Sequence, residues 1–397
     1  MHPNTVLPSG SAAATPPAWG AVMAMSLGAF VLVASEFMPV SLLTPIAADL
    51  GVSQGQAGQA ISVSGAFALV TSLCISSLAG RLDRKVLLLA LTFLMIGSGT
   101  LAAIAPNYAT FMIGRAFIGI AVGGFWSMSA ATAMRLVPIQ EVPRALALLN
   151  GGNALATVVA APLGSYLGAI LGWRGAFFCL IPFALIAFVW KLATMPSIPM
   201  PPQANSGNVF TLLRQPRVAL GMAAVSLFFM GQFTLFTYLR PFLETVTRVD
   251  TPTLSLLLLV IGVAGLAGTM LIGVLLKNRL YPTLIAIPLL MAVLALALVR
   301  FGDSLAITMV LVGIWGLAAT AAPVGWWTWL ARTLPQDAER GGGLMVAVVQ
   351  LAIAAGATVG GLLFDAHGYR ATFGLGALVL VLAAALAALA ARSGRDS

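Results

Sequence analysis

The sequence predicts an all-α, polytopic membrane protein with twelve transmembrane helices in two pseudo-symmetric six-helix bundles. Hydrophobic residues make up 60% of the 397 residues and charged residues only 8%, against about 25% charged in a soluble domain. So much apolar surface requires lipid as the solvent. Backbone polar groups in lipid must be satisfied internally, by helices or a closed barrel. The apolar runs are continuous and do not alternate, so helices are predicted.

Each apolar run is about 17 to 29 residues long, enough for a helix to cross ~30 Å of hydrocarbon. The predicted segments are Trp19–Ala47, Ala57–Leu78, Val86–Ile104, Tyr108–Met134, Ala145–Leu171, Ala176–Leu192, Val218–Phe242, Thr253–Leu276, Tyr281–Val299, Leu305–Leu330, Gly343–Phe364 and Ala371–Ala391.

A proline-rich polar stretch divides six of these segments from the other six. We therefore expect an N-terminal tail (1–18), a first bundle (19–193), a cytoplasmic linker (194–217), a second bundle (218–391) and a C-terminal tail (392–397). The first eighteen residues contain no Lys or Arg, which is untypical of a cleaved signal peptide, so the first helix is predicted to be a retained anchor.

The two halves resemble each other at an offset near 196 residues. Parallel repeats of this kind are typical of two-bundle transporters, and chance similarity between Gly/Ala-rich helices is the alternative. The matching positions are Ala161, Gly164, Leu167, Gly172, Arg174 and Phe177 with Ala357, Gly360, Leu363, Gly368, Arg370 and Phe373.

The distribution of the positive charges indicates the orientation of the chain in the membrane. The net charge is +9, but Lys and Arg are spread over many short loops and form no patch for nucleic acid. With the N-terminus inside, cytoplasmic segments carry fourteen Lys and Arg and the opposite side five. This bias predicts a bacterial cytoplasmic (inner) membrane protein with both termini in the cytoplasm.

Glu36 is an ionisable residue well inside the first apolar segment. A charge at that depth costs at least ~2.5–3.5 kcal/mol, so such residues are usually functional. An apolar setting disfavours the ionised carboxylate, and a carboxyl of this kind can bind and release a proton in each cycle. The alternative is a structural carboxylate fixed by an Arg or a hydroxyl. Pro39 and Pro45 are expected to kink the helix and free carbonyls near Glu36.

Arg115 lies about two turns into the fourth segment and needs a partner there. We predict a contact or a water bridge with Glu36, and the two residues together as the proton-coupling site. The alternatives are that Arg115 binds backbone carbonyls or extends outward to the surface.

Polar and aromatic residues within the segments are the candidates for substrate binding. Amides offer paired donors and acceptors, and aromatic rings offer a stacking face to a planar ligand. For Asn150 and Asn153 the competing role is capping or packing of the helix. The candidates are Trp126, Asn150, Asn153, Gln232, Tyr238, Trp315 and Gln350.

Other classes of protein are less well supported. No Gly-rich loop with a Walker-type Lys is present, which disfavours ATP-driven transport. The only histidines are His2 and His367, so no metal site, cofactor or enzymatic activity is predicted. A repeated pore segment, as expected of a channel, is not visible.

With these residues in view, the whole chain resembles the drug:proton antiporter branch of the major facilitator superfamily. Gly80–Lys85 looks like a shortened form of its cytoplasmic gate motif, which implies a gating role for Asp83 and Arg84. Arg115 with Gly119 and Gly123 looks like its helix-four proton-transfer motif, and Ala161–Gly164 like its antiporter motif, with Ala where Gly is usual.

Longer stretches are similar to the purine ribonucleoside efflux pumps within that superfamily. This resemblance implies export of purine ribonucleosides such as inosine and guanosine in exchange for protons, by a monomeric carrier with alternating access. Sugar and drug exporters share parts of the signature and are the alternative for the substrate. Uptake by a symporter is the alternative for the direction of transport. The stretches are Glu36–Pro45, Gly123–Ala130, Met134–Pro138, Ile314–Leu317, Pro323–Trp326, Gly231–Phe233, and Tyr238 with Arg240–Pro241.

Overall fold

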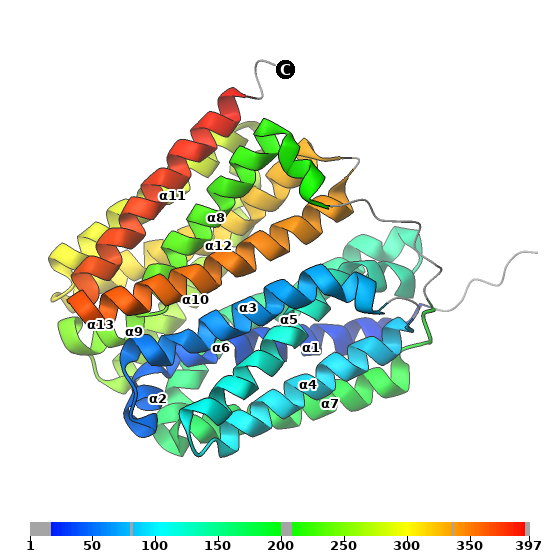
Figure 1. The fold of residues 1–397 in the computed structure, drawn as a ribbon, viewed down its shortest axis with the longest axis horizontal. Helices are drawn as coiled ribbons and strands as arrows, with labels where there is room; N and C mark the ends of the chain where they lie inside the picture. The colour runs from blue at the N-terminus through cyan, green and yellow to red at the C-terminus, as the bar shows by residue number, and fades with distance from the viewer. Residues whose placement is uncertain (1–16, 80–81, 200–208, 336, 394–397) are drawn as a thin grey trace, which may run out of the picture.

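The computed structural model describes residues 17–79, 82–199, 209–335 and 337–393, and every regular element within them is a helix (Figure 1). The predicted terminal tails and the middle of the linker lie largely outside the described residues. The first half contains α1 (Trp19–Ser41), α2 (Leu43–Leu50), α3 (Gln54–Ala79), α4 (Arg84–Ile104), α5 (Tyr108–Leu136), a 3-10 turn (Ile139–Glu141), α6 (Val142–Phe178) and α7 (Leu180–Thr194).

The second half follows the same plan. It contains a 3-10 turn (Val209–Arg214), α8 (Pro216–Phe236), α9 (Leu239–Phe242), a π-helical turn (Leu243–Thr247), α10 (Thr251–Asn278), α11 (Leu280–Phe301), α12 (Leu305–Thr333) and α13 (Ala338–Arg392).

Ten helical stretches of the described residues are long and apolar enough to span a membrane. Two of them, Ile139–Thr194 and Arg340–Arg392, have 56 and 53 residues, more than twice the ~20 residues that one crossing needs. Each is interrupted by a glycine with left-handed backbone, Gly172 at φ 74° and Gly368 at φ 73°. Each long stretch therefore supplies two of the twelve predicted segments, and the two interrupting glycines stand at the predicted offset of 196 residues.

Two of the predicted segments are each divided into two helices, the first where a proline kink was expected and the second where none was predicted. Trp19–Ala47 is divided at Leu42 (φ −117°, ψ 12°) into α1 and α2. Val218–Phe242 is divided between α8 and α9, where Tyr238 has φ −105° and ψ 15°. Leu42 and Tyr238 are again 196 residues apart, and a proline, Pro45 or Pro241, follows each break by three residues. Proline cannot donate an i→i−4 hydrogen bond, so a break just before it has a local cause.

Buried apolar side chains form two large clusters. One draws almost entirely on the first half and the other on the second, and the halves lie as two bodies in Figure 1. We call the end where α1 meets α2 the elbow end, and the end where residues 194–217 connect the halves the linker end. The helices α3 and α13 are side by side near the elbow end and separate toward the linker end (Figure 1).

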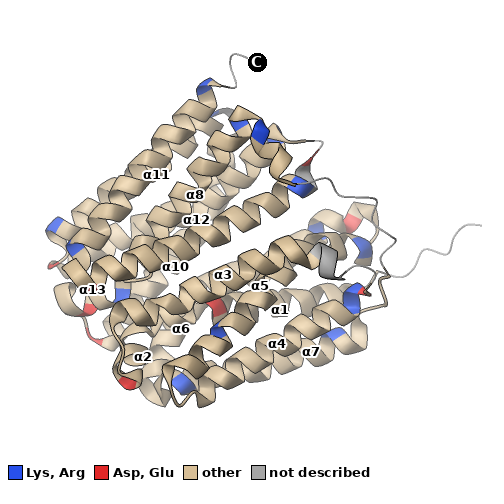
Figure 2. Cartoon of the chain, in the orientation of Figure 1, with Lys and Arg blue, Asp and Glu red and all other residues tan. Residues whose placement is uncertain are grey.

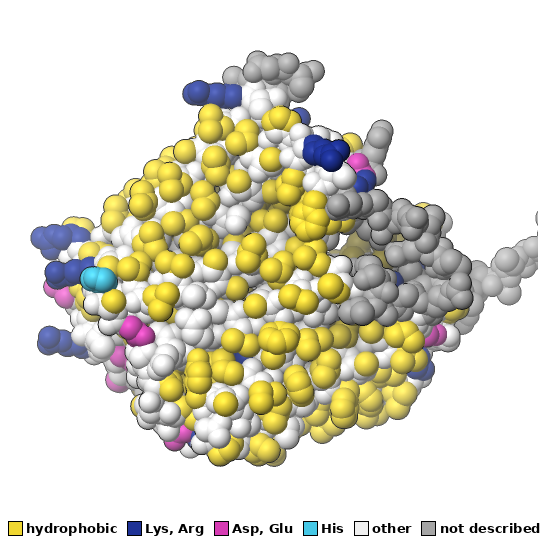
Figure 3. Space-filling model, in the orientation of Figure 1, with side chains coloured by type: hydrophobic (Ala, Val, Ile, Leu, Met, Phe, Trp, Pro, Cys, Tyr) yellow, Lys and Arg dark blue, Asp and Glu magenta, His cyan; other side chains and the backbone are white. Residues whose placement is uncertain are grey.

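The surface has the character expected of a protein solvated by lipid. Charged residues gather at the helix ends, and few lie along the helices (Figure 2). Hydrophobic side chains cover the sides of both halves between the charged ends (Figure 3). Many of these exposed side chains are large, such as Phe93, Met270 and Val274 at 66%, 72% and 73% exposure. Such a surface is incompatible with water as the surrounding solvent, so the chain is a multi-pass membrane protein.

Candidate functional site

Glu36 lies on α1 at the interface between the two halves. Its side chain is only 5% exposed. Its Oε1 accepts a hydrogen bond of 3.4 Å from Nε2 of Gln350 on α13. The carboxyl group therefore touches a neutral amide of the opposite half, which the sequence analysis had placed among the substrate-binding candidates.

Arg115 on α5 binds the backbone next to Glu36. Its Nη1 donates to the carbonyl of Ser35 (2.8 Å) and its Nη2 to that of Glu36 (2.7 Å). Normal helix geometry would pair the Ser35 carbonyl with the N–H of residue 39, but Pro39 has none. Because of Pro39, the Ser35 carbonyl is free to accept from Arg115. This confirms the expectation that Pro39 frees a carbonyl near Glu36.

Two further bonds join Arg115 to α3, to the carbonyl of Ala60 (3.1 Å) and to Oγ of Ser64 (3.2 Å). The guanidinium is 1% exposed, and it links α1, α3 and α5. Among the described residues it forms no ion pair with the Glu36 carboxylate. Arg115 therefore contacts Glu36 through the main chain, as the alternative of backbone carbonyls described. The proton-coupling role of the pair stays a prediction.

The second half places an amide where the first half has the acid. Gln232 on α8 stands 196 residues after Glu36, and Phe233 stands 196 after Phe37. The rings of Phe37 and Phe233 stack across the interface with centroids 5.6 Å apart. Two related side chains can meet in this way only close to the pseudo-symmetry axis. Glu36 and Gln232 therefore flank the centre of the interface from opposite halves.

Two of the predicted substrate residues carry a buried polar atom without a hydrogen-bond partner in the described structure. These atoms are Oε1 of Gln232 and Nε1 of Trp315. Both side chains are at most 9% exposed. Buried polar groups in native proteins are nearly always paired, so an unpaired acceptor and an unpaired donor suit a polar ligand.

The remaining candidates of the first half are more accessible. Trp126 is half-buried, and its ring meets Phe125 edge-on at 5.4 Å. Asn150 is exposed, and its Nδ2 donates to the Leu146 carbonyl of its own helix (2.9 Å). Asn153 is partly exposed. The amide of Asn150 thus already has a partner within its own helix, as the competing structural role predicted.

Tyr238 lies away from Glu36, at the elbow end between α3 and α13. It is fully buried, its Oη donates to the Ala357 carbonyl (2.7 Å), and its ring stacks on Phe364 at 5.2 Å. A Cβ atom added at Gly58 or Gly361 would come within 2.2 or 2.3 Å of the phenol oxygen. In this conformation Tyr238 packs the two halves together, and its role in substrate binding stays a prediction.

The same end holds further contacts between the halves that the sequence analysis did not identify. Asp365 of α13 accepts hydrogen bonds from the hydroxyl of Ser53 and, at 2.9 Å, from the N–H of Gly55 at the start of α3. Its carboxylate thus caps a helix of the other half. Thr358 of α13 donates at 2.9 Å to Ser62 of α3.

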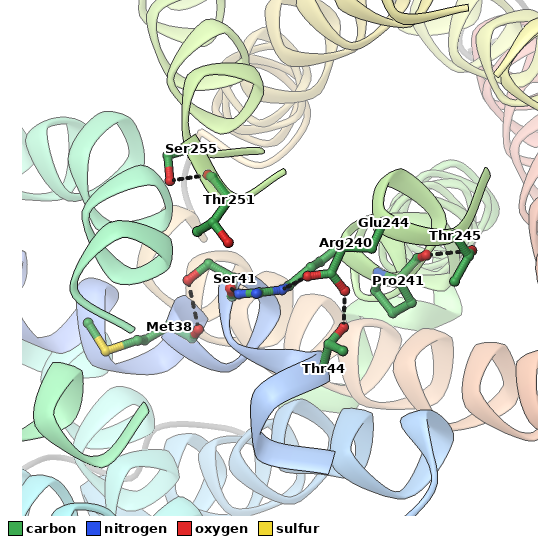
Figure 4. Close-up of polar contacts among 9 residues, drawn as sticks. All are labelled: Met38, Ser41, Thr44, Arg240, Pro241, Glu244, Thr245, Thr251 and Ser255. Atoms are coloured by element: carbon green, nitrogen blue, oxygen red, sulfur yellow. Dashed lines mark hydrogen bonds and ion pairs between the residues drawn. The ribbon is translucent and has the colours of Figure 1, made fainter. Parts of the chain in front are cut away.

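A second set of contacts at the elbow end involves Arg240 and Glu244 (Figure 4). Arg240 Nε and Glu244 Oε1 form an ion pair of 2.8 Å. Arg240 Nη1 donates to the Ser41 carbonyl, and Glu244 Oε2 accepts from Thr44 Oγ1 at 2.5 Å. From the sequence, Arg240 was one of the charges outside the cytoplasm and part of a stretch similar to the efflux pumps, without a predicted structural role. The available signal was Pro45, which leaves the Ser41 carbonyl without a partner four residues earlier.

Asp83 and Arg84 of the gate motif lie at the linker end of the first half, where they bind residues at the start of the linker. Asp83 caps α4 by accepting from the N–H of Lys85 (2.7 Å), and it also binds the Ser197 hydroxyl and the N–H of Ile198 (3.1 Å). Burial would raise the pKa of Asp83, but these hydrogen bonds lower it below its usual value. The N–H of Arg84 donates to the Ile198 carbonyl (3.1 Å).

Lys191 of α7, one of the fourteen residues counted as cytoplasmic charges because it stands near a helix end, is a buried cation. It is 1% exposed. Its Nζ donates to Thr92 Oγ1 (2.9 Å) and lies 5.6 Å from the ring centroid of Phe125. It contacts the interior of the first half and not the interface with the second.

The comparisons with known proteins agree with this architecture. A Major Facilitator Superfamily profile matches residues 25–343. The transcription regulatory protein OpdE of Pseudomonas aeruginosa is 63% identical over 379 residues, 94% of each chain. The purine ribonucleoside efflux pump NepI of Salmonella paratyphi B is 40% identical over 373 residues, also 94% of each chain.

Two solved structures share the fold at low sequence identity. The D-xylose-proton symporter superposes with a TM-score of 0.74 at 17% identity, covering 93% of this chain and 97% of its own. A bacterial homologue of the human lysosomal transporter Spinster, inward-facing and occupied, gives a TM-score of 0.76 at 15% identity, with 96% and 98% coverage.

Proposed function

Because this chain belongs to the major facilitator superfamily of membrane transporters, we propose that it exports purine ribonucleosides, such as inosine and guanosine, in exchange for protons. The two halves would rock about the interface so that a central site faces each side of the membrane in turn. We place the linker end and both termini in the cytoplasm of a bacterial inner membrane, with the monomer as the working unit.

The observation that carries the proposal is the position of Glu36. It is a buried carboxyl at the contact between the halves, and its side-chain partner is the neutral Gln350 of the opposite half. A proton on this carboxyl removes a charge from the interface that would otherwise be costly in a membrane interior. Proton binding there can therefore favour one arrangement of the halves over the other.

The substrate class is supported by two independent features. NepI, named as a purine ribonucleoside efflux pump, shares 40% of its residues with this chain over nearly its full length. Gln232, the sequence neighbour of the interfacial Phe233, offers a free acceptor. Trp315 of α12 offers a free donor, and Trp126 of α5 adds a partly exposed aromatic face. A nucleoside has a planar base and several polar groups, which suit this combination.

The name of OpdE, a transcription regulatory protein, is compatible with this proposal. A carrier that exports a small effector changes the concentration of that effector in the cytoplasm. Such a change alters transcription without any contact between the carrier and DNA.

The decisive experiment replaces Glu36 by Gln and measures inosine exchange in proteoliposomes. One proton moving down 100 mV supplies ~2.3 kcal/mol, enough for a solute gradient of about fifty-fold at ~1.4 kcal/mol per tenfold. Glu36→Gln should abolish accumulation driven by pH or voltage but retain inosine counterflow, because glutamine can still pair with Gln350.

The matched control is Glu141→Gln, which neutralises an acid that is 44% exposed and paired with Arg144 at the linker end. This variant should accumulate inosine like the parent protein. If Glu36→Gln also accumulates inosine normally, Glu36 is not the proton carrier.

A panel of inosine, guanosine, arabinose and a cationic drug tests the substrate class. The runner-up function is proton-coupled export of sugars or drugs by the same interface. Trp126→Ala and Trp315→Ala should weaken transport of the nucleosides more than that of arabinose. Preference for arabinose or the drug in the parent protein would overturn the nucleoside assignment and leave the carrier class intact.

A further inference from the structure

The Arg240–Glu244 cluster contains groups from both halves at the elbow end. Arg240 and Glu244 come from α9 and the π-helical turn that follows it, and their partners Ser41 and Thr44 come from α1 and α2. Figure 4 shows the guanidinium pointing from the second half toward Ser41, with Glu244 turned toward Thr44.

The local backbone of each half is shaped for this contact. Pro45 removes the N–H that would otherwise bind the Ser41 carbonyl, so this carbonyl is available to an outside donor. On the other side, the π-helical turn Leu243–Thr247 holds Glu244. Single π-helical turns are frequent at functional positions. The contact thus joins two irregular segments, where separation breaks no helical hydrogen bond.

The charges in the cluster are arranged so that the contact is reversible. Arg240 is 8% exposed and Glu244 24% in this closed arrangement. Their ion pair lies within one segment, at an i,i+4 spacing, and travels with the second half. When the halves separate, each charge keeps its partner, and only the Ser41 and Thr44 bonds are exchanged for water. A buried arginine without an ion-pair partner in its own segment would have no partner left in the open arrangement.

The cluster also adjoins the proton site. The segment from Glu36 to Ser41 is fixed at one end by Arg115 of its own half and at the other end by Arg240 of the opposite half. Pro39 lies between these two anchors. A displacement of the Ser41 end therefore displaces Glu36 as well, because the segment between them is short. Pro39 leaves this segment without one of its helical hydrogen bonds.

We propose that Arg240 and Glu244 form a latch that holds the elbow end closed, with Arg240 as the residue that positions the proline-flanked end of α1. Release of the Ser41 carbonyl is the step that lets the elbow end open. The inference requires only that the halves rock, and it holds whatever the substrate and the coupling ion are.

The test measures distances between spin labels in the full-length protein in nanodiscs, in a background without Cys74 and Cys179. One label pair, at Ala109 and Asp303, reports the elbow end. A second pair, at Gln140 and Ala331, reports the linker end. All four positions are exposed in the structure.

Arg240→Gln should lengthen the elbow-end distance and shorten the linker-end distance. The ratio of elbow-open to elbow-closed molecules should rise roughly tenfold, the equivalent of ~1.4 kcal/mol. Thr44→Val, which removes a donor from the first half alone, should shift the ratio in the same direction by less. It also tests the latch if Arg240→Gln does not fold.

Two further variants separate a latch from a local ion pair. The exchange Arg240→Glu with Glu244→Arg restores opposite charges within the segment but places no donor at position 240, so it should open the elbow end at least as far as Arg240→Gln. Thr245→Val is the matched control, because the Thr245 hydroxyl binds only the Pro241 carbonyl of its own segment, and it should match the parent protein.

Two results would overturn the proposal. The first is an Arg240→Gln protein whose two distances equal those of Thr245→Val. The second is a lengthening at both ends, because it shows general loosening where a latch demands opposite changes. Transport measurements on the same variants are independent, so failure of nucleoside export would leave the latch standing.

Discussion

Replacing Arg115 by Met should destabilise the first half severely while leaving its membrane insertion intact. Methionine fills a similar volume but donates no hydrogen bond. The carbonyls of Ser35, Glu36 and Ala60 would lose their charged donor, and Ser64 would lose a fourth contact. Side-chain hydrogen bonds in membrane proteins average ~0.6 kcal/mol and reach ~1.7. Four such bonds give an expected loss of about 2–7 kcal/mol, a large part of a typical free energy of unfolding.

The assay is unfolding of the purified protein in mixed micelles by a denaturing detergent, followed by tryptophan fluorescence. Ser64→Ala removes the longest of the four bonds together with the local bond from Ser64 to the Ile61 carbonyl, and it should cost about 1 kcal/mol. Arg115→Lys keeps the charge but cannot match the planar fork of donors, so it should fall between these two variants. If Arg115→Met loses no more stability than Ser64→Ala, the backbone contacts of Arg115 do not hold α1, α3 and α5 together.

Three other changes test the remaining structural arguments. Gly172→Ala and Gly368→Ala should each cost about 1–2 kcal/mol of stability because L-residues avoid left-handed backbone. Gly374 lies in a helix with open space around it, so Gly374→Ala should stabilise the protein by about 0.5–1 kcal/mol. Equal effects on the melting temperature at all three positions would contradict this. Lys191→Met should leave stability unchanged or raise it, since a buried cation is replaced by an apolar chain of similar size, and a loss above about 2 kcal/mol would show an essential charge. The lowered pKa of Asp83 means that its stabilising bonds persist at neutral pH and weaken as the pH falls below about 4; the melting-temperature gap between parent and Asp83→Asn should be constant from pH 7 to 5 and close in stronger acid.

Much of the fold could be predicted because its determinants are local. Long apolar runs must become helices in lipid whatever their neighbours are. The repeat at an offset of 196 located Gly172 and Gly368, and the structure gives both the same left-handed backbone. Pro39 was expected to free a carbonyl, since the missing N–H is a property of the residue itself.

The partners of the polar groups could not be predicted in the same way. Arg115 was expected to contact Glu36, and it does so through the Glu36 carbonyl, while the side chain beside the carboxyl is that of Gln350. Tyr238 was predicted to bind substrate, and its packing between α3 and α13 in this conformation was not predicted. Sequence spacing gives the depth of such a residue in the membrane and leaves its direction around the helix axis open.

The sequence by itself determined that lipid surrounds this protein, how many times the chain crosses the membrane, that its halves repeat, and that an acidic residue lies deep in the first helix. Only the tertiary structure decided which end of the two halves is closed, that Arg240 spans that closure to Ser41, and that Glu36 meets the opposite half. The physical reason is that hydrophobicity and proline geometry act within a segment. Hydrogen bonds between helices depend on rotations and approaches that no single segment contains.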